Sequence, residues 1–464
     1  MDTLPVVSPK QLVALGFDLP VPCRVEGLAG LDDLVCLKAL RVVPDRRMVF
    51  LATNADTRIV VKLINGQRRQ TQQCAAEEKG IIALEGLAVT TQKIYASYWG
   101  VSTDIGYIAT RYIENAQDLL ATWLQQSDDQ RVTLLEQVML VFCKMHNGGV
   151  FQEDAHLNNF LCREGEIFVI DGASINTEHL GKALDHEQSL DNLVVLFGQL
   201  YPHFDPLIPA ALDYYLQHRT GLSEPITLPA LEKQLAAFRK ERLAKYLKKV
   251  FRESTEHVCF QDKHQFVVFA RVHDTPMARE FARDPDAFVE QGEMLKQGNS
   301  STVVQTVFND KPCVIKRYNI KSMPHAIRRS VQTSRAWVSW RNAHMLRALG
   351  IPTPEPVLLY EARWGAMRST AYFISEQVTD ATQLSELIEQ GLSKDEGLKL
   401  FERFFDALKR SQVTHGDMKA TNFFVRDDVV IPIDLDGMSW HQSVSSFEQA
   451  FAEDQKRFIQ NWSA

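Results

Sequence analysis

The chain has 464 residues, which is enough for two or three domains. Hydrophobic residues make up 45% of it and charged residues 23%, values typical of a globular protein and not of a disordered, collagen-like or membrane-embedded chain. Asp and Glu (58) outnumber Lys and Arg (51), and the resulting net charge of −7 argues against general coating of nucleic acid. We therefore expect no nucleic-acid partner.

Cysteine usage and the absence of an apolar leader point to a reducing compartment. The seven cysteines are widely spaced and none forms a CxxC pair, which favours free thiols over a disulfide framework or a zinc site. The N-terminus shows no basic start followed by an apolar core, so we expect no secretion signal. The apolar stretch 134–145 is interrupted by Glu136 and Lys144 and is too short to span a bilayer. These features predict a cytoplasmic protein.

In chain order, the first informative element is the apolar run VVKLI at 60–64, which predicts a strand with Lys62 inside it. A lysine in an apolar strand is unfavourable unless its ammonium group finds anionic partners. Glu77 follows on a predicted helix and is a candidate partner. The alternative is that Glu77, like Glu78 beside it, is an ordinary solvent-facing residue. No glycine-rich turn precedes Lys62.

The next element is a predicted helix over 134–145 that ends at the Gly148-Gly149 pair. After it comes VFQEDAHLNNFLCREGEIFVIDGAS at 150–174, in which NFLC, a polar turn and IFVID predict a hairpin. Three polar residues stand out in this segment, the last of them where a strand runs out: Asp154, Asn159 and Asp171.

A charged connection is predicted next, over residues 236–285. Its stretch FRKERLAKYLKKVFR at 238–252 holds seven basic residues and one acidic residue. One interpretation is a solvated linker helix. The other is a surface that meets a phosphorylated sugar or anionic lipid headgroups, with peripheral contact at the inner face of the cytoplasmic membrane.

The second half of the chain repeats the pattern of the first. CVIKRY at 313–318 is an apolar run that holds Lys316, and VTHGDMKATNFFVRDDVVIPIDLDG at 413–437 follows another helical pattern. The repeated polar residues are Asp417, Asn422 and Asp434. In both copies 17 residues separate the two aspartates, and corresponding residues lie 263 positions apart. Such a repeat predicts two similar domains.

These residue types suit phosphoryl transfer, which needs positioning and charge neutralisation more than covalent chemistry. A strand lysine grips the phosphates of a nucleotide. An asparagine and a strand-end aspartate supply oxygen ligands for Mg²⁺, a hard cation that prefers them. A loop aspartate orients the acceptor hydroxyl and takes its proton.

The motifs also resemble a known superfamily. HGDMKATN at 415–422 and IDLDG at 433–437 are similar to the catalytic and metal-binding loops of protein-kinase-like enzymes. Most of residues 290–440 resembles InaA-type lipopolysaccharide kinases, through LKQGNSSTVV at 295–304, VIKRYN at 314–319, SRAWVSWRNAHMLRALGIPTPEP at 334–356 and HGDMKATNFFV at 415–425. The first half resembles the superfamily more distantly, through VVKLI, DAHLNN and VIDG.

The resemblance implies an α+β fold with two tandem protein-kinase-like bilobal domains. Each would have a strand-rich small lobe over a mainly helical large lobe, with nucleotide in the cleft. We expect a divergent first domain at 1–235, the linker and entry to domain two at 236–285, and the second domain at 286–464. The implied cofactors are ATP and Mg²⁺. The implied acceptor is a sugar hydroxyl of the lipopolysaccharide core, or a similar anionic glycolipid.

The resemblance also assigns roles to individual residues of the second domain. Asp417 would be the catalytic base, with Lys419 near the transferred phosphoryl group. Lys316 would contact phosphates, beneath a turn that holds Gly298 and Asn299. The magnesium ligands would be Asn422 and Asp434. In the first domain the matching residues are Asp154 as base, Lys62 with Glu77 at the phosphates, and Asn159 and Asp171 at the metal.

Departures from the kinase pattern leave other functions open. Gln152 stands in the first copy where the second has His415, and Asn342 stands where a lysine-pairing glutamate is expected, so we expect Lys316 to be held differently. Asp436 replaces the glycine usual in protein kinases, which favours a small-molecule or sugar kinase. The alternatives are a protein Ser/Thr kinase, which Lys419 favours, and a non-catalytic scaffold formed by one domain, above all the first.

Two further groups have alternative interpretations. Arg328, Arg329 and Arg335 are placed to meet an acidic substrate or to form an ordinary charged helix face. Trp337 and Trp340 are three residues apart, a spacing that favours a core position over a platform for a sugar.

Overall fold

The structure is a computed structural model that describes residues 4–463 except residue 299, residues 320–332 and residue 366. The chain divides into two compact units. The N-terminal unit comprises residues 1–200 and 204–239, and the C-terminal unit comprises residues 201–203 and 240–464. The predicted limits of the kinase-like domains, at 235 and 286, stay predictions. Within the predicted connection 236–285 lie the end of helix α7 (Leu228–Lys249) and the first strands of the second sheet.

The sheet of the N-terminal unit has seven strands in the order β1-β2-β3-β4-β5-β7-β6. All neighbours are antiparallel except β1 and β2. The strands are β1 (Val6–Val7), β2 (Cys23–Val25), β3 (Leu34–Val43), β4 (Arg47–Asn54), β5 (Thr57–Asn65), β6 (Ile94–Tyr98) and β7 (Ile105–Arg111). Side chains alternate across a strand, so Val61 and Leu63 of β5 are buried in a core while Lys62 between them points to the other face.

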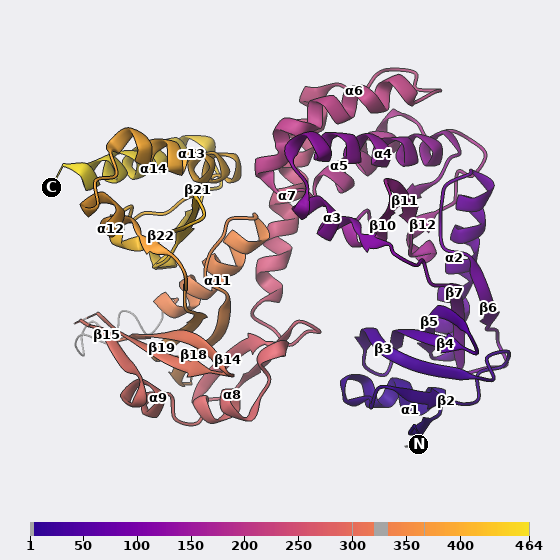
Figure 1. Cartoon of the computed structure of the whole chain (residues 1–464), viewed down its shortest axis with the longest axis horizontal. Coiled ribbons are helices and arrows are strands. Elements are labelled where there is room, and N and C mark those ends of the chain that lie inside the picture. The colour runs from indigo at the N-terminus through magenta and orange to yellow at the C-terminus, as the bar shows by residue number, and fades with distance from the viewer. Residues whose placement is uncertain (1–3, 299, 320–332, 366, 464) are drawn as a thin grey trace. The chain divides into compact units, whose positions relative to one another are not determined.

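Helices make up most of the rest of this unit. They are α1 (Pro9–Leu15), α2 (Gln67–Gly86), α3 (Leu119–Gln125), α4 (Asp128–Asn147), α5 (His186–Phe197), α6 (Ile208–His218) and most of α7. In Figure 1 the sheet lies at the lower end of this unit and α4, α5 and α6 at its upper end, with α2 beside β7. Helix α4 ends where predicted, because Gly148 caps it. The predicted hairpin is β10 (Phe160–Arg163) with β11 (Glu166–Val169).

Short strands complete the N-terminal unit around the segment that holds the first motif. β8 (Gln117–Asp118) pairs with β10, and β9 (Phe151–Gln152) pairs with β12 (Ile175–Asn176). The chain from β9 to β12 contains all three polar residues of the first motif.

The C-terminal unit also has a seven-stranded sheet, in the order β13-β14-β18-β19-β17-β16-β15 and antiparallel throughout. The strands are β13 (His257–Gln261), β14 (Gln265–Ala270), β15 (Glu293–Gln297), β16 (Ser301–Phe308), β17 (Lys311–Tyr318), β18 (Pro356–Trp364) and β19 (Met367–Glu376). Five strands have the same order in both units, β15-β16-β17-β19-β18 matching β3-β4-β5-β7-β6. The two extra strands extend opposite edges, beside β3 in one unit and beside β18 in the other.

The described helices of the C-terminal unit lie on both sides of this sheet and in a second, mainly helical part. They are α8 (Pro276–Phe281), α9 (Pro285–Gln291), α11 (Arg335–Ala348), α12 (Leu384–Glu389), α13 (Lys394–Ser411) and α14 (Val444–Ile459). Figure 1 shows α8 and α9 at the lower end of this unit, α12, α13 and α14 at its upper end, and α11 between them. The predicted α+β class is thus confirmed, with a strand-rich and a mainly helical part in each unit.

Short strands again frame the second motif. The predicted hairpin is β22 (Phe423–Arg426) with β23 (Val429–Pro432), and β20 (Thr382–Gln383) adds to it. β21 (Val413–Thr414) pairs with β24 (Ser439–Trp440), so the start of the second motif lies beside the strand that directly follows the motif.

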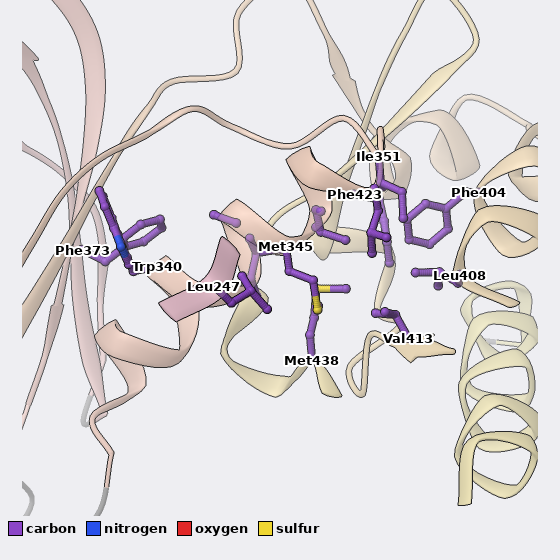
Figure 2. Close-up of a cluster of buried hydrophobic side chains, with 14 of the residues drawn as sticks. Leu247, Trp340, Met345, Ile351, Phe373, Phe404, Leu408, Val413, Phe423 and Met438 are labelled. Carbon is purple, nitrogen blue, oxygen red and sulfur yellow. The ribbon is translucent and has the colours of Figure 1, made fainter. Parts of the chain in front are cut away.

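One continuous hydrophobic core joins the two parts of the C-terminal unit. Figure 2 shows part of it, from Phe373 of the sheet and Trp340 of α11 to Phe404 and Leu408 of α13. Trp340 is fully buried, as its predicted core position requires. This packing holds the sheet over the segment 413–437.

Predicted effect on stability: Phe401→Ala should strongly destabilise the C-terminal unit. Phe401 is fully buried, with ring centroids 4.4 Å from Phe458 and 5.2 Å from Phe423. Truncation of such a ring costs about 3–5 kcal/mol. Chemical denaturation should show this loss, whereas Val444→Ala at an exposed site should change stability by less than about 0.5 kcal/mol. Equal stability of the two variants would contradict the core described above.

None of the helices within the described part of the chain is both long enough and apolar enough to cross a membrane.

Candidate active site

In the C-terminal unit the strand lysine meets the strand-end aspartate. Lys316 lies in β17, between β16 and β19, and its Nζ donates to Oδ1 of Asp434, 118 residues further along the chain. Asp434 follows β23 and has a left-handed backbone, with φ of 59°. Both side chains are largely buried, at 16% and 30% exposure. The structure therefore brings these two predicted residues into direct contact.

Charge controls the ionisation of this aspartate. Burial raises the pKa of Asp434, but the ammonium of Lys316 and, more weakly, the guanidinium of Arg335 outweigh burial and leave the pKa below its usual value. Asp434 is thus held as a carboxylate, the form that binds a cation.

The loop between β21 and β22 carries the predicted base. Asn422 donates from Nδ2 to the backbone oxygen of Asp417 at 2.9 Å and to its Oδ2 at 3.1 Å. Lys419 reaches the same carboxylate, with Nζ 3.2 Å from Oδ1. This loop lies beside the strand-end aspartate, because Ile433 donates its N–H to the backbone oxygen of Asn422 at 2.8 Å. The structure thus brings Asp417, Lys419 and Asn422 together.

A buried histidine joins the same two segments. His415 is fully buried, and its Nε2 lies 3.2 Å from the backbone oxygen of Ile433. Burial lowers the pKa of His415, although nearby Asp454 opposes the shift. A neutral imidazole in this position links the loop before Asp417 to the backbone just before Asp434.

Helix α14 and the turn after it hold the loop by groups that the motif did not predict. Asp454 is 1% exposed and accepts hydrogen bonds from the backbone N–H groups of His415 (its Oδ2, 2.6 Å) and Gly416 (its Oδ1, 3.0 Å). Arg457 donates to the backbone oxygen of Gly416. Asn461 accepts from the N–H of Ala420 at 2.9 Å and donates to the oxygen of Met418 at 2.8 Å. The loop backbone is therefore fixed from one side.

A signal for Asp454 is present in the sequence. Phe447, Phe451, Asp454 and Phe458 follow one another at helical spacing. A carboxylate within an apolar helix face predicts a buried partner, since an unpaired buried charge is costly. Which partner it meets, 38 residues earlier in the chain, is not readable from that pattern.

The turn predicted to cover a nucleotide joins β15 to β16. Gly298 donates its N–H to the oxygen of Ser301 at 3.1 Å and accepts from Asn319 Nδ2 at 3.2 Å. Asn299 lies outside the described residues, as do Arg328 and Arg329. The third arginine of that group, Arg335, begins α11 and pairs with Asp436 at 2.7 Å.

The N-terminal unit has a similar arrangement. Lys62 Nζ lies 2.6 Å from Glu77 Oε1 and 2.9 Å from Asp171 Oδ1. Asp171 again has a left-handed backbone, with φ of 67°. Asn159 donates from Nδ2 to the backbone oxygen of Asp154 at 2.8 Å. All five predicted residues of this unit therefore take part in two local sets of contacts.

Glu77 is the centre of the first set. It is 3% exposed and also accepts hydrogen bonds from the N–H groups of Gly172 and Ala173, both at 3.1 Å. Burial lowers the pKa of Lys62, but Glu77 and then Asp171 outweigh burial and leave that pKa above its usual value. The lysine is thus held as an ammonium ion.

The loop of the N-terminal unit is anchored by different residues. Asn192 donates from Nδ2 to the backbone oxygen of Gln152 at 2.7 Å and lies 3.0 Å from Nε2 of His146 through its Oδ1. The Nδ1 of His146 lies 2.8 Å from the hydroxyl of Tyr215. A neutral imidazole satisfies both contacts, as donor to Asn192 and acceptor from Tyr215.

The predicted magnesium ligands fit that ion better than a transition metal. Within the described part of the chain, no three His, Cys, Asp or Glu side chains gather to hold a metal. Mg²⁺ typically takes one or two protein oxygen ligands and completes its shell with phosphate oxygens and water. Asp434 offers a carboxylate, and the amide nitrogen of Asn422 is bound to Asp417, which leaves its carbonyl oxygen as the available ligand.

A comparison with protein families gives one match. Residues 285–442 match the lipopolysaccharide kinase (Kdo/WaaP) family. The matched range lies in the C-terminal unit and contains Lys316, Asp417 and Asp434, but ends before Asp454. No curated protein matches the chain. The predicted recognition of a lipopolysaccharide kinase family and its class of enzyme, a phosphotransferase, are confirmed for this segment.

Predicted pH dependence: the stability of the N-terminal unit should fall as pH drops from about 6.5 to about 4. Burial lowers the pKa of His146 to about 4, so over this range the unfolded chain binds a proton that the folded chain does not. Stability from this group is complete above pH 6.5 and lost progressively below it, by up to about 3 kcal/mol.

The measurement is chemical denaturation between pH 7.5 and pH 4.5. His146→Gln should be less stable than the wild type at pH 7.5 but lose less stability on acidification. Identical pH slopes for the two proteins would show that His146 does not carry this dependence.

Proposed function

We propose that the C-terminal unit is an ATP- and Mg²⁺-dependent kinase that phosphorylates a sugar hydroxyl of the lipopolysaccharide core. The observation that carries the proposal is the contact of Lys316 with Asp434 next to the loop of Asp417 and Asn422, within a segment that matches a lipopolysaccharide kinase family. The match supports kinase activity on lipopolysaccharide. We propose further that ATP is the phosphoryl donor, that Mg²⁺ is required and that the acceptor is a core sugar.

In the proposed mechanism each residue has one task. Lys316 holds the nucleotide phosphates, and Asn422 with Asp434 would hold Mg²⁺, which neutralises the charge of those phosphates when bound. Asp417 accepts a hydrogen bond from the acceptor hydroxyl and takes its proton as the oxygen bonds to the γ-phosphorus, while the bond from the γ-phosphorus to the β–γ bridging oxygen breaks and ADP leaves. Lys419, beside that carboxylate, contributes positive charge where the phosphoryl group passes.

Phosphorylation of a protein Ser or Thr is the less favoured alternative. The segment matches a lipopolysaccharide kinase family, and Asp436 stands where protein kinases usually have glycine. Asp454 and Asn461, in α14 and the turn after it, support the loop and are not free to bind a peptide. A compact acceptor suits this unit better.

We propose that the N-terminal unit is a second, divergent kinase-like domain. Its Lys62, Glu77 and Asp171 form the contacts expected of a phosphate-binding centre. A non-catalytic scaffold is the second candidate, because the turn between β3 and β4 (residues 44–46) has no glycine and Gln152 replaces the histidine of the other unit. Contact of the stretch 238–252 with anionic lipids at a membrane stays a prediction.

Predicted effect on catalysis: Asp417→Asn should lower phosphoryl transfer from ATP by at least about 100-fold, since it removes the base that takes the acceptor proton. Asp427→Asn, at an exposed turn of the β22–β23 hairpin, is the matched control and should retain full activity. Purified lipopolysaccharide core and radiolabelled ATP provide the assay. Full activity of Asp417→Asn would exclude the C-terminal unit as the catalyst.

Asp154→Asn distinguishes the two candidates for the N-terminal unit. A scaffold predicts an unchanged rate in the same assay, and a second catalytic centre predicts a loss. MgATP binding to the chain in a Lys316→Met, Asp434→Asn background, which removes the C-terminal phosphate and metal contacts, reports whether the N-terminal site holds nucleotide.

Predicted effect on the substrate: deletion of the gene should remove one phosphate from the lipopolysaccharide core. Mass spectrometry of the isolated core measures the loss, and the wild-type gene, but not the Asp417→Asn gene, should restore it. A core of unchanged mass would refute the substrate while leaving phosphotransferase chemistry in place.

A further inference from the structure

The two units hold their lysines by different means. In the N-terminal unit, Glu77 on α2 pairs directly with Lys62 and also binds the backbone after Asp171. In the C-terminal unit, Asn342 on α11 binds the backbone after Asp434, donating from Nδ2 to the oxygens of Leu435 (2.8 Å) and Met438 (3.2 Å). Asn342 thus keeps the contact of the helix with the loop but supplies no charge to the lysine.

The missing carboxylate comes from the loop itself. Asp436 Oδ2 lies 3.8 Å from Lys316 Nζ and 2.7 Å from Arg335 Nη2, and its side chain is 10% exposed. In the N-terminal unit the equivalent position, two residues after the strand-end aspartate, is Ala173. The loop carboxylate is therefore present where the helix glutamate is absent.

The arginine changes together with these two positions. Arg335 stands seven residues before Asn342 on α11, and seven residues before Glu77 on α2 stands Gln70, which is neutral. Glu77, Ala173 and Gln70 in one unit thus correspond to Asn342, Asp436 and Arg335 in the other. A carboxylate placed near Asp434 adds a second negative charge, and Arg335 pairs with that carboxylate at 2.7 Å.

An aromatic ring fixes both cations relative to one another. The Nζ of Lys316 lies 5.2 Å and the Cζ of Arg335 5.0 Å from the ring centroid of Tyr318. The Tyr318 hydroxyl lies 2.8 Å from Ser339 Oγ, one turn along α11 from Arg335. Cation–π contact with a buried, hydrogen-bonded ring restricts where each cation can go.

We propose that Asp436 and Arg335 are positioning residues that hold Lys316 for phosphate binding, and that they replace the helix glutamate used in the N-terminal unit. The inference rests on the proposed function, because it concerns how the same kinase site binds nucleotide. Through Asp436 and Arg335, Lys316 is held by the loop that follows Asp434 and by the first turn of α11.

The test compares single variants with a triple variant that places the residues of the N-terminal unit at the corresponding positions of the C-terminal unit. Asp436→Asn and Arg335→Gln should each raise the KM for ATP about 10-fold or more, with a smaller change in kcat, because each removes a contact that holds Lys316 in place. The triple variant Asn342→Glu, Asp436→Ala, Arg335→Gln rebuilds the N-terminal pattern and should recover a KM within about threefold of wild type. Arg347→Gln, on the same helix but paired with Glu355, is the matched control and should leave KM unchanged.

Two measurements distinguish a failure of the proposed function from a failure of the inference about Asp436 and Arg335. MgATP affinity, measured by calorimetry without any acceptor, should fall for both single variants, and Arg335→Lys should retain more of it than Arg335→Gln. Wild-type protein that does not bind MgATP would refute the proposed function. Wild-type protein that binds MgATP, with unchanged affinity in both single variants or no recovery in a folded triple variant, would refute the inference about Asp436 and Arg335.

Discussion

In each unit an ion pair joins the sheet to the loop after a hairpin, at the centre of the candidate site. Lys62 and Lys316 lie in central strands of their sheets, and each side chain points to the face opposite a buried core. The ammonium group of Lys62 meets Asp171, and that of Lys316 meets Asp434, each of which follows a hairpin. A buried ammonium or carboxylate without its partner costs several kcal/mol, so the pair constrains both elements. The strand-rich part and the mainly helical part of each unit are held in register by this contact as well as by apolar packing.

Backbone conformation aims the carboxylate at the lysine. Asp171 and Asp434 have φ of 67° and 59°, in the left-handed region that few residues other than glycine, asparagine and aspartate adopt readily. The same conformation in both units, at residues 263 positions apart, turns the chain sharply after the strand. In the N-terminal unit the turn also allows Gly172 to approach α2 so closely that a Cβ on Gly80 would lie 2.0 Å from the Gly172 oxygen. In the N-terminal unit, α2, the loop after Asp171 and Lys62 are therefore in close mutual contact.

The parts of this arrangement that the sequence predicted are those encoded by short spacing. The aspartate and the asparagine five residues later share one loop, and a hairpin of fixed length leads to the second aspartate, so each motif can be recognised from a short stretch of sequence. The lysines could be identified because a charge within an apolar strand requires a partner. The contacts of Asp454 with Gly416 and of Arg335 with Asp436 join segments 38 and about 100 residues apart, which no local spacing encodes. The placement of the extra strands at opposite sheet edges was equally unpredicted, because strand pairing across a sheet is set by tertiary packing.

Charge balance explains why two different sets of residues can serve the same geometry. In the C-terminal unit, Lys316 and Arg335 face two carboxylates, Asp434 and Asp436. In the N-terminal unit the carboxylates of Glu77 and Asp171 face Lys62. Burial and, next, Arg41 lower the pKa of Arg47, and Asp171 and Glu77 oppose that shift without overcoming it. Arg47 begins β4, directly after the turn that lacks glycine. Each centre thus combines two carboxylates with two cations, but in the N-terminal unit the second cation comes from the strand beside the turn and not from the helix. By strand order the turn before β4 corresponds to the turn that holds Gly298 in the C-terminal unit, so the two centres differ in charge at the same turn.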